Sequence, residues 1–486
     1  MNSTAAVVKS ITEQNARATP DNRGPHAARP GRPRVIRAIG SKVLRAIAGD
    51  LPEFAADRLT FLPAVARERG SVALMRFGAL RVALLTDPQL IDEVLVRRNK
   101  EFGKHYLPSV GGALLGNGLF TSSGEFWKRE RRLAQPAFHK SRLATYGDVM
   151  ATYAAQEAAT WRDGETRDLS DDMMRLTLRI VGKTLFGADV TGDAAALGRD
   201  MEVVRKCFVA KLNAIAPMPE RIPTRTNRQL KRAVRDMDRM VLRVAAERRA
   251  SGEDAGDLLS MLLSAQDDTG VGMTDLQLRD EVMTLFVGGH ETTAIALTWT
   301  WHLLGNHPDV LAEVRTELAE VLDGRIPTTA DLPRLVVLER VLRESLRLYP
   351  PVYAFDRKTL ADLELGGKQL RKGTVVLISP WVLHRRPESF ADPEQFAPDR
   401  WVDPAPRRDK AYLPFGGGPR VCIGNGFAWM EMTLVMAAML QQVSCEPAGT
   451  ADVVADPSIT LRPQGGLPMV VRRVADQIES APPAAA

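Results

Sequence analysis

Residues 415–424 read Phe-Gly-Gly-Gly-Pro-Arg-Val-Cys-Ile-Gly, and this stretch constrains the fold more than any other part of the chain. Its consecutive glycines and its proline disfavour a regular helix, so it predicts a bent loop that carries Cys422 to a fixed position. Residues 427–442 are mostly apolar and contain neither glycine nor proline, which predicts a helix directly after the loop. The start of that helix and Arg420 place positive charge near the sulfur, which lowers a thiol pKa and favours the metal-binding thiolate. From these residues alone, a small buried cysteine beside an ordinary glycine turn remains the alternative.

The spacing Phe-x-x-Gly-x-Arg-x-Cys-x-Gly is matched at Phe415, Gly418, Arg420, Cys422 and Gly424. It resembles the haem-binding signature of the cytochrome P-450 superfamily. The resemblance implies that Cys422 is the axial ligand of the iron in haem b (iron protoporphyrin IX), and that Phe415, Arg420 and Gly424 belong to the same cofactor site. A thiolate ligand pushes electron density towards the iron and favours O–O cleavage.

Residues 274–304 predict a helix of roughly 30 residues, which would span about 45 Å at 1.5 Å per residue. Thr274 with Gln277 forms a capping box, and Gly305 with Pro308 predicts the end. Apolar residues surround this helix, yet residues 288–293 read Gly-Gly-His-Glu-Thr-Thr. Each interior glycine costs up to about 1 kcal/mol relative to alanine, and a buried carboxylate needs a partner. Such departures are expected at a functional site, and a kinked core helix with a satisfied polar patch is the alternative.

The same run resembles the family's oxygen-activation motif. The resemblance implies that the glycines, Gly288 among them, leave room for O₂, and that Thr292 and Glu291 are catalytic residues that deliver protons. His290 occupies a variable position of the motif. We expect it to make a polar contact near the helix, and a role as a ligand is the alternative.

Three further residues are expected at the haem propionates. Trp127 and Arg131 stand at i and i+4, so they share one face of a predicted helix. They resemble the family's Trp-x-x-x-Arg, which implies that both groups reach a propionate. Arg357 lies where the family has its second propionate contact. A cation stacked on an aromatic ring of a surface helix is the alternative for the Trp127 pair.

A structural triad is also expected. Glu344 and Arg347 form a Glu-x-x-Arg on a helix predicted over residues 331–349, and Arg400 follows in a later loop. The resemblance implies that these three residues stabilise the surroundings of the haem and take no part in the chemistry. Trp401 stands where the family usually has Phe, and His384 is expected to be structural.

Together these motifs predict a mainly α fold with a small β region, the cytochrome P-450 fold. We expect a basic, disordered leader over residues 1–45, a single domain over 46–474 and a low-complexity tail over 475–486. Strands are expected at 71–77 and 80–86, and a hairpin is expected to pair 459–463 with 467–472. Residues 141–250 predict long helices with one interruption at 216–223.

Composition narrows the class of protein. The chain has 486 residues, a net charge of +6 and three scattered cysteines, which argues against a disulfide framework. No apolar run approaches the 18 residues of a membrane span, so we expect a soluble, cytoplasmic protein. For the basic leader, a solvated tail, a membrane-surface contact and an organellar presequence stay open. No nucleic-acid-binding motif accompanies the charge, so no nucleic-acid partner is expected.

The resemblance implies a monooxygenase that inserts one oxygen atom of O₂ into a small apolar substrate of fatty acid, terpenoid, steroid or polyketide type. No dinucleotide fingerprint is present, so we expect electrons from a ferredoxin or flavodoxin and its NAD(P)H-dependent reductase, docking near Cys422 and residues 128–132. The alternatives are a peroxide-using variant, a non-catalytic haem-thiolate binder or gas sensor, and a helical scaffold with an inert cysteine. The expected substrate contacts are Phe286, Gly288, Val352, Phe355 and Ile459.

Overall fold

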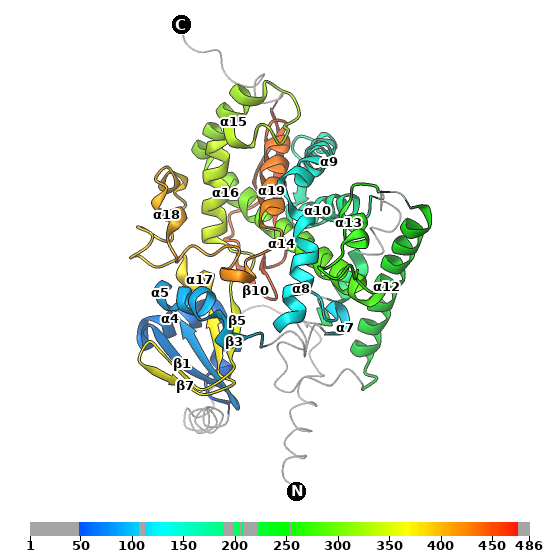
Figure 1. Ribbon diagram of the computed structural model, residues 1–486. Coiled ribbons are helices and arrows are strands. Elements are labelled where there is room, and N and C mark those ends of the chain that lie inside the picture. Colours follow the sequence, from blue (N-terminus) through cyan, green and yellow to red (C-terminus); the bar gives the residue numbers. More distant parts are fainter. Residues whose placement is uncertain are drawn as a thin grey trace, which may run out of the picture. The chain divides into compact units, whose positions relative to one another are not determined.

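The computed structural model describes residues 48–105, 112–187, 198–204, 206–207, 222–252 and 254–474 (Figure 1). The expected leader, the tail and most of the expected interruption at 216–223 lie outside the described residues. Helices dominate the described part and its strands form small sheets, which confirms the mainly α fold with a small β region. No helix in these ranges is long and apolar enough to cross a membrane.

The helical elements alternate with short connections along the chain. The helices are α3 (Leu51–Ala56), α4 (Arg58–Arg69), α5 (Pro88–Asp92), η1 (Glu93–Arg97), η2 (Asn99–Glu101), α7 (Gly112–Leu115), α8 (Gly124–Ala134), η3 (Gln135–Phe138), α9 (Lys140–Ala159), α10 (Leu169–Phe186), α12 (Arg225–Ser251), α13 (Leu258–Ser264), α14 (Asp275–Asn306), α15 (Pro308–Leu322), η4 (Leu332–Arg334), α16 (Val336–Leu348), α17 (Pro380–Leu383), η5 (Pro398–Trp401), α18 (Ala405–Arg408), η6 (Gly418–Arg420) and α19 (Asn425–Leu440). The strands are β1 (Val72–Phe77), β2 (Leu80–Leu85), β3 (Phe102–Gly103), β4 (Thr166–Asp168), β5 (Phe355–Thr359), β6 (Leu363–Leu365), β7 (Lys368–Leu370), β8 (Val375–Ile378), β9 (Val443–Pro447), β10 (Ala455–Pro457), β11 (Leu461–Pro463) and β12 (Pro468–Arg473).

Helix α14 contributes to both main apolar clusters of the helical part. One cluster joins it to α9, α10, α15, α16 and α19, and the other joins it to α7, α10, α12 and α13 (Figure 1). Because α14 is enclosed on several sides, its apolar residues surround the axis and form no single stripe. The capping box of Thr274 and Gln277 is present as predicted.

The predicted end of α14 at Gly305 is wrong, since the helix continues to Asn306. Gly305 lies inside the last turn, against the side chain of Met469 and the backbone of Cys445. A Cβ at Gly305 would lie 2.4 Å from Met469 Cε and 2.7 Å from Cys445 O. The glycine therefore permits close packing of α14 on β9 and β12, and α15 begins soon after it at Pro308.

The largest sheet has the strand order β1-β2-β8-β5-β3. Its first two strands form the predicted antiparallel pair, with Val72 opposite Leu85. The hairpin predicted between 459–463 and 467–472 is wrong. Strand β11 pairs with β10, and β12 pairs with β9 and β4. The backbone of Leu461 is engaged elsewhere, because its N–H donates to Pro351 O (2.9 Å) and its carbonyl accepts from Trp299 Nε1 (2.7 Å).

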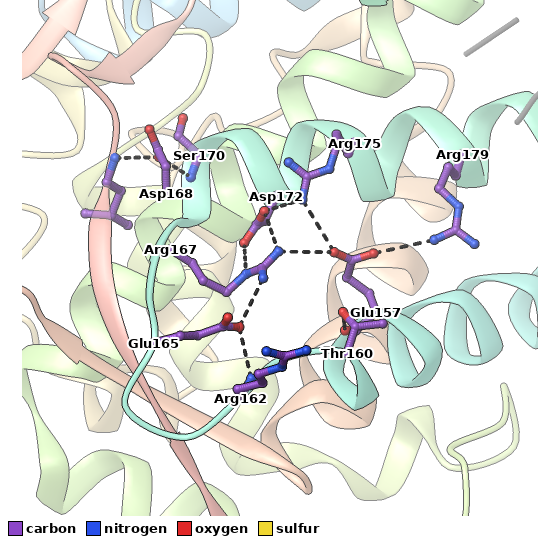
Figure 2. A network of polar contacts seen from close by, with 11 residues as sticks. Glu157, Thr160, Arg162, Glu165, Arg167, Asp168, Ser170, Asp172, Arg175 and Arg179 are labelled. Carbon is purple, nitrogen blue, oxygen red and sulfur yellow. Dashed lines mark hydrogen bonds and ion pairs between the residues drawn. The ribbon is translucent and has the colours of Figure 1, made fainter. Parts of the chain in front are cut away.

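A third prediction fails between α9 and α10, where continuous helix was expected and the chain forms β4. Figure 2 shows the polar network that holds this connection. Arg167 binds Asp172 (2.6 Å), and Asp168 caps α10 while accepting from the backbone N–H of Leu467 (2.8 Å). Asp168 therefore ties the connection to the chain that enters β12. The other labelled members are Glu157, Thr160, Arg162, Glu165, Ser170, Arg175 and Arg179.

The buried carboxylate of Glu344 on α16 fixes the segment that leads to the cysteine loop. Glu344 and Arg347 are both fully buried and form an ion pair with two N···O distances of 2.8 Å. Arg400 Nε donates to Glu344 at 3.0 Å, so the structure brings the expected triad together. Trp401 Nε1 and the backbone N–H of Ala397 also donate to Glu344, at 2.9 and 3.0 Å. Trp401, which stands where the family usually has Phe, is therefore a further hydrogen-bond donor to this carboxylate.

Glu344→Gln is expected to lower the free energy of unfolding by about 3–5 kcal/mol, because it leaves Arg347 buried without its counter-charge. Glu339→Gln is the matched control on the same helix. Its partner Arg343 is partly exposed, so a loss of about 0–1 kcal/mol is expected. Urea unfolding of the haem-loaded variants measures both. Equal losses would contradict the structural role of Glu344.

Candidate active site

The loop before α19 is shaped by close backbone packing. Gly418 has φ +67°, and a Cβ there would lie 1.9 Å from Leu95 O of η1. Only glycine fits this position without a shift of the backbone. The N–H of Cys422 donates to Phe415 O at 3.0 Å, which closes the loop. The helix predicted over 427–442 is present as α19, which runs from Asn425 to Leu440 and so begins two residues earlier than predicted.

Cys422 keeps accessible surface although its thiol is desolvated by the surrounding protein. Cys422 is exposed, yet burial raises the pKa of its thiol, a combination that a recessed position gives. The expectation of a lowered thiol pKa from Arg420 and the helix start is wrong for the protein alone. The backbone of Gly424 and the guanidinium of Arg131 lower the pKa by less than burial raises it. A metal ion deprotonates a coordinating thiol outright, so coordination would supply the thiolate.

Helix α8 lies directly against the cysteine loop. Arg131 Nη1 donates to Val421 O (2.9 Å), and Arg420 Nη2 donates to Ser122 O just before α8 (3.0 Å). The guanidinium of Arg420 lies over the ring of Trp127, 4.2 Å from its centroid. The structure therefore brings Trp127, Arg131, Arg420 and Cys422 together, as the motifs predicted.

Cations gather around this loop without carboxylate partners. Arg131, Arg357 and Arg420 form no ion pair among the described residues, and burial lowers the pKa of each, that of Arg420 to about 10. Lys104, directly after β3, is a further member that the sequence analysis missed. Burial together with Arg357 and Arg420 lowers the pKa of Lys104 to about 7. No motif marked Lys104, because only the pairing of β3 with β5 brings it beside Arg357.

These groups fit an iron porphyrin with acidic side chains. A cysteine sulfur is a suitable ligand for iron. The buried Arg357 and the partly buried Arg131 and Arg420 lack carboxylate partners in the described part of the chain, and the two propionates of haem b would supply them. Desolvated positive charges without counter-charges are costly in a protein interior. This donor set is therefore consistent with a bound dianion next to the cysteine.

The middle of α14 opens on one side. Gly288 is exposed within this largely buried helix, and a Cβ there would meet no atom within 4 Å. Thr292, one turn later on the same face, donates its hydroxyl to Gly288 O at 2.6 Å. Leu285 precedes Gly288 by one turn and is partly buried. The accessible side of α14 therefore carries Leu285, Gly288 and Thr292.

Phe286 and His290 lie on a different side of α14. Phe286 is 1% exposed, stacks on His290 and belongs to the cluster with α10, α12 and α13. His290 Nε2 contacts Met174 O at 3.0 Å, which is the expected polar contact, and burial lowers its pKa to about 4. Helical periodicity points to Leu285 as the apolar side chain beside Gly288 and leaves Phe286 in the core.

Glu291 is held by residues that no motif indicated. Its carboxylate accepts a hydrogen bond from the Thr460 hydroxyl and pairs with Arg462 Nη2 at 2.8 Å. The apolar residues around Glu291 in the sequence indicated that its carboxylate needs a partner. Only the packing of a distant segment against α14 identifies Thr460 and Arg462 as the partners. Thr460 and Arg462 flank Leu461, whose contacts to Pro351 and Trp299 fix this segment against α14.

Three of the expected substrate contacts are Val352, Phe355 and Ile459, which lie close in sequence to Pro351 or to Thr460. Val352 follows Pro351 and is 37% exposed, whereas Ile459 precedes Thr460 and is partly buried. Phe355 begins β5, and the guanidinium of Arg357 lies 5.5 Å from its ring centroid. These residues retain accessible surface, unlike Phe286.

Comparison with known proteins identifies the family. The profile of the cytochrome P450 family matches residues 45–467. Cyclooctatin synthase of Streptomyces melanosporofaciens is 39% identical over 417 residues, which cover 83% of this chain and 88% of the relative. Cyclooctat-9-en-7-ol 5-monooxygenase of the same organism is 38% identical, with 80% and 84% covered. Pentalenene oxygenase of Streptomyces avermitilis is 34% identical, with 78% and 85% covered. The chain therefore belongs to the cytochrome P450 family, and it is a haem-thiolate monooxygenase that uses haem b.

Proposed function

We propose that this monooxygenase hydroxylates a terpenoid that is mostly hydrocarbon and carries at most a few hydroxyl groups. The opening of α14 at Gly288, beside Leu285 and Thr292, is the observation that carries this proposal. An apolar side chain and a glycine next to a single hydroxyl suit a substrate without charge. The names of the Streptomyces relatives denote action on pentalenene and on cyclooctat-9-en-7-ol, an unsaturated alcohol. They support the terpenoid class over fatty acids, steroids and polyketides.

Each group of the site has one role in this proposal. Cys422 would ligate the iron through its sulfur, and Trp127, Arg131, Arg357 and Arg420 would hold the propionates. Haem, when bound, supplies the centre at which O₂ is activated for insertion into a C–H bond. Phe415 and Gly424 shape the loop that presents the sulfur, as the 3.0 Å bond from Cys422 N to Phe415 O indicates.

Thr292 and Glu291 deliver protons from the protein side. The Thr292 hydroxyl donates to Gly288 O, which leaves its lone pairs available on the accessible face of α14. Glu291 lies next in the chain and is fixed by Thr460 and Arg462. The side chain of Arg462 is 18% exposed, so this ion pair connects the buried helix to the solvent side. A relay of this kind distinguishes the proposal from a peroxide-using variant, which needs no protons from the protein.

Addition of a panel of apolar compounds to the haem-loaded protein tests the substrate class. We expect cyclic terpene hydrocarbons and their mono-alcohols to shift the haem spin state at micromolar concentration, and straight-chain fatty acids to give no shift, because their carboxylate finds no cation on the accessible face of α14. Cys422→Ser is expected to abolish both this shift and the thiolate-type carbon monoxide spectrum. A shift with fatty acids alone would overturn the terpenoid assignment.

Thr292→Ala is expected to divert electrons into hydrogen peroxide and to lower the product formed per electron by about tenfold or more, because the hydroxyl that accepts and orients a proton-delivering group on the accessible face is lost. The measurement is peroxide released per NAD(P)H consumed, with a surrogate ferredoxin, its reductase and a substrate found in the panel. Thr298→Ala is the matched control, since its hydroxyl makes the same type of bond to Ala294 O but is buried. Unchanged coupling in Thr292→Ala would remove Thr292 from the relay.

We further propose that an acidic ferredoxin, supplied with electrons by an NAD(P)H-dependent reductase, docks beside the cysteine loop at residues 128–132. The contact between Arg131 and Val421 supports this location, because it brings α8 against the loop. Lys128, Arg129 and Arg132 are paired with Glu125, Asp267 and Asp268. The exposed pairs of Lys128 and Arg132 are worth only about 0–1 kcal/mol, so a carboxylate of the partner can replace the internal one at these two residues. Arg129 also pairs with the buried Glu130 at 2.7 Å and stays in place.

The electron-transfer rate from the ferredoxin is therefore expected to fall as ionic strength rises. Arg132→Glu should lower the second-order rate constant at low salt and weaken its salt dependence. Arg232→Glu on α12 changes an exposed charge by the same amount and serves as the control. Equal effects of the two variants, or a rate independent of salt, would contradict docking at α8.

A further inference from the structure

The turn between β10 and β11 presents Ile459, one of the expected substrate contacts. Pro457 at the end of β10 lies opposite Leu461 at the start of β11, so residues 458–460 form a tight turn with Ile459 at its tip. Ile459 is partly buried and keeps accessible surface. The place of this apolar side chain therefore depends on the bonds that hold the turn on its two sides.

The side of the turn that leads into β11 is held by α14 and by the chain after α16. The Thr460 hydroxyl and the guanidinium of Arg462 both bind the carboxylate of Glu291. The N–H of Leu461 donates to Pro351 O at 2.9 Å. These bonds fix residues 460–462 against the long helix and against the segment that carries Val352.

The other side of the turn is held by one hydroxyl and one guanidinium. The hydroxyl oxygen of Tyr353 lies 3.2 Å from the carbonyl oxygens of both Pro457 and Ser458, and its single O–H donates to this pair. Arg58, the first residue of α4, donates from Nη1 to Pro457 O at 2.6 Å. Tyr353 is 7% exposed and Arg58 is 6% exposed, so solvent does not compete freely for these carbonyls.

The backbone of Tyr353 is itself fixed. Its carbonyl oxygen accepts from Ser379 Oγ at 2.8 Å and from the N–H of Trp381 at 3.3 Å. The indole of Trp381 in turn donates to Leu59 O of α4 at 3.1 Å, beside Arg58 in the chain. A tyrosine side chain has only two rotatable angles, so its ring is a stiff spacer between this backbone and the turn.

We propose that Tyr353, supported by Arg58, is a positioning residue that sets the separation of Val352 and Ile459 and thereby selects the carbon atom that is hydroxylated. Val352 directly precedes Tyr353 and is 37% exposed, and Ile459 directly follows the carbonyl that Tyr353 binds. The proposal rests on the proposed hydroxylation of an uncharged substrate and adds the residues that orient it. Such a substrate is oriented by the shape of the wall around it, so a small displacement of one side chain changes which C–H bond is presented.

Tyr353→Phe tests this role, because it removes the hydroxyl and keeps the ring. The haem-loaded full-length protein is supplied with a surrogate ferredoxin, its reductase and the panel compound that gives the largest spin-state shift, and the hydroxylated isomers are separated by gas chromatography. We expect the ratio of the main isomer to the others to fall by about fivefold, which corresponds to one net hydrogen bond. Haem content and the carbon monoxide spectrum should match wild type.

Tyr146→Phe is the matched control on α9. Tyr146 is also 7% exposed, and its hydroxyl donates to a backbone carbonyl, Gly256 O, at 3.3 Å. Its isomer ratio should equal that of wild type. An unchanged ratio in Tyr353→Phe, or an equal fall in both variants, would overturn the positioning role.

A double-mutant cycle shows whether Tyr353 acts through the turn. In an Ile459→Ala background, Tyr353→Phe should change the isomer ratio by less than about twofold, because the side chain that the turn presents is absent. A further fall as large as in the parent protein would overturn this route. Arg58→Met removes the second donor to Pro457 O and should lower the ratio in the same direction, and this variant carries the test if Tyr353→Phe does not load haem.

The outcome for Tyr353 is distinguishable from the outcome for the substrate class. A spin-state shift with fatty acids alone would overturn the terpenoid assignment, and the isomer ratio is then measured with the fatty acid. A terpenoid that gives the same isomer ratio in wild type and in Tyr353→Phe would overturn the role of Tyr353 and support the substrate class.

Discussion

The carboxylate of Glu344 is the constraint on which the cysteine side of the molecule depends. It accepts hydrogen bonds from two guanidinium groups, an indole and a backbone N–H, all in the protein interior. Arg347 in turn donates to the carbonyls of His384 and Pro393. The ring of His384 accepts from the N–H of Leu413, two residues before Phe415. A buried charge with satisfied partners thus fixes the entry of the loop that carries Cys422.

Two glycines, Gly418 in the cysteine loop and Gly288 in α14, have opposite roles in shaping the site. The cysteine loop requires glycine at residue 418 because the backbone of Leu95 occupies the place of a side chain. The long helix α14 has glycine at residue 288 for the opposite reason, since free space lies beside it. One glycine therefore serves close packing and the other serves an opening, which agrees with a cofactor held on one side and a small substrate admitted on the other.

The pKa values of the charged groups around Cys422 are shifted more by desolvation than by individual ion pairs. Burial raises the pKa of Cys422 and lowers the pKa values of Arg131, Arg357 and Lys104, so each group disfavours its charged form in the protein alone. In the proposed assignment, an iron bound to Cys422 and two propionates beside the cations would reverse these preferences together. Loading of the cofactor would then stabilise the folded site.

The sequence by itself determined the parts of this protein that depend on local chemistry. These are the cysteine loop, the capped helix around Thr292, the first hairpin and the Glu-x-x-Arg pair, because glycine, proline and helical spacing act over a few residues. Only the tertiary structure decided which distant groups meet. Arg462 reaches Glu291, Trp401 reaches Glu344, Lys104 joins the arginines, and β12 pairs with β9 and β4 instead of forming a hairpin. Those contacts join segments up to about 300 residues apart. Which segments meet depends on the packing of the whole core, and a pattern of neighbouring residues in the sequence carries no information about that packing.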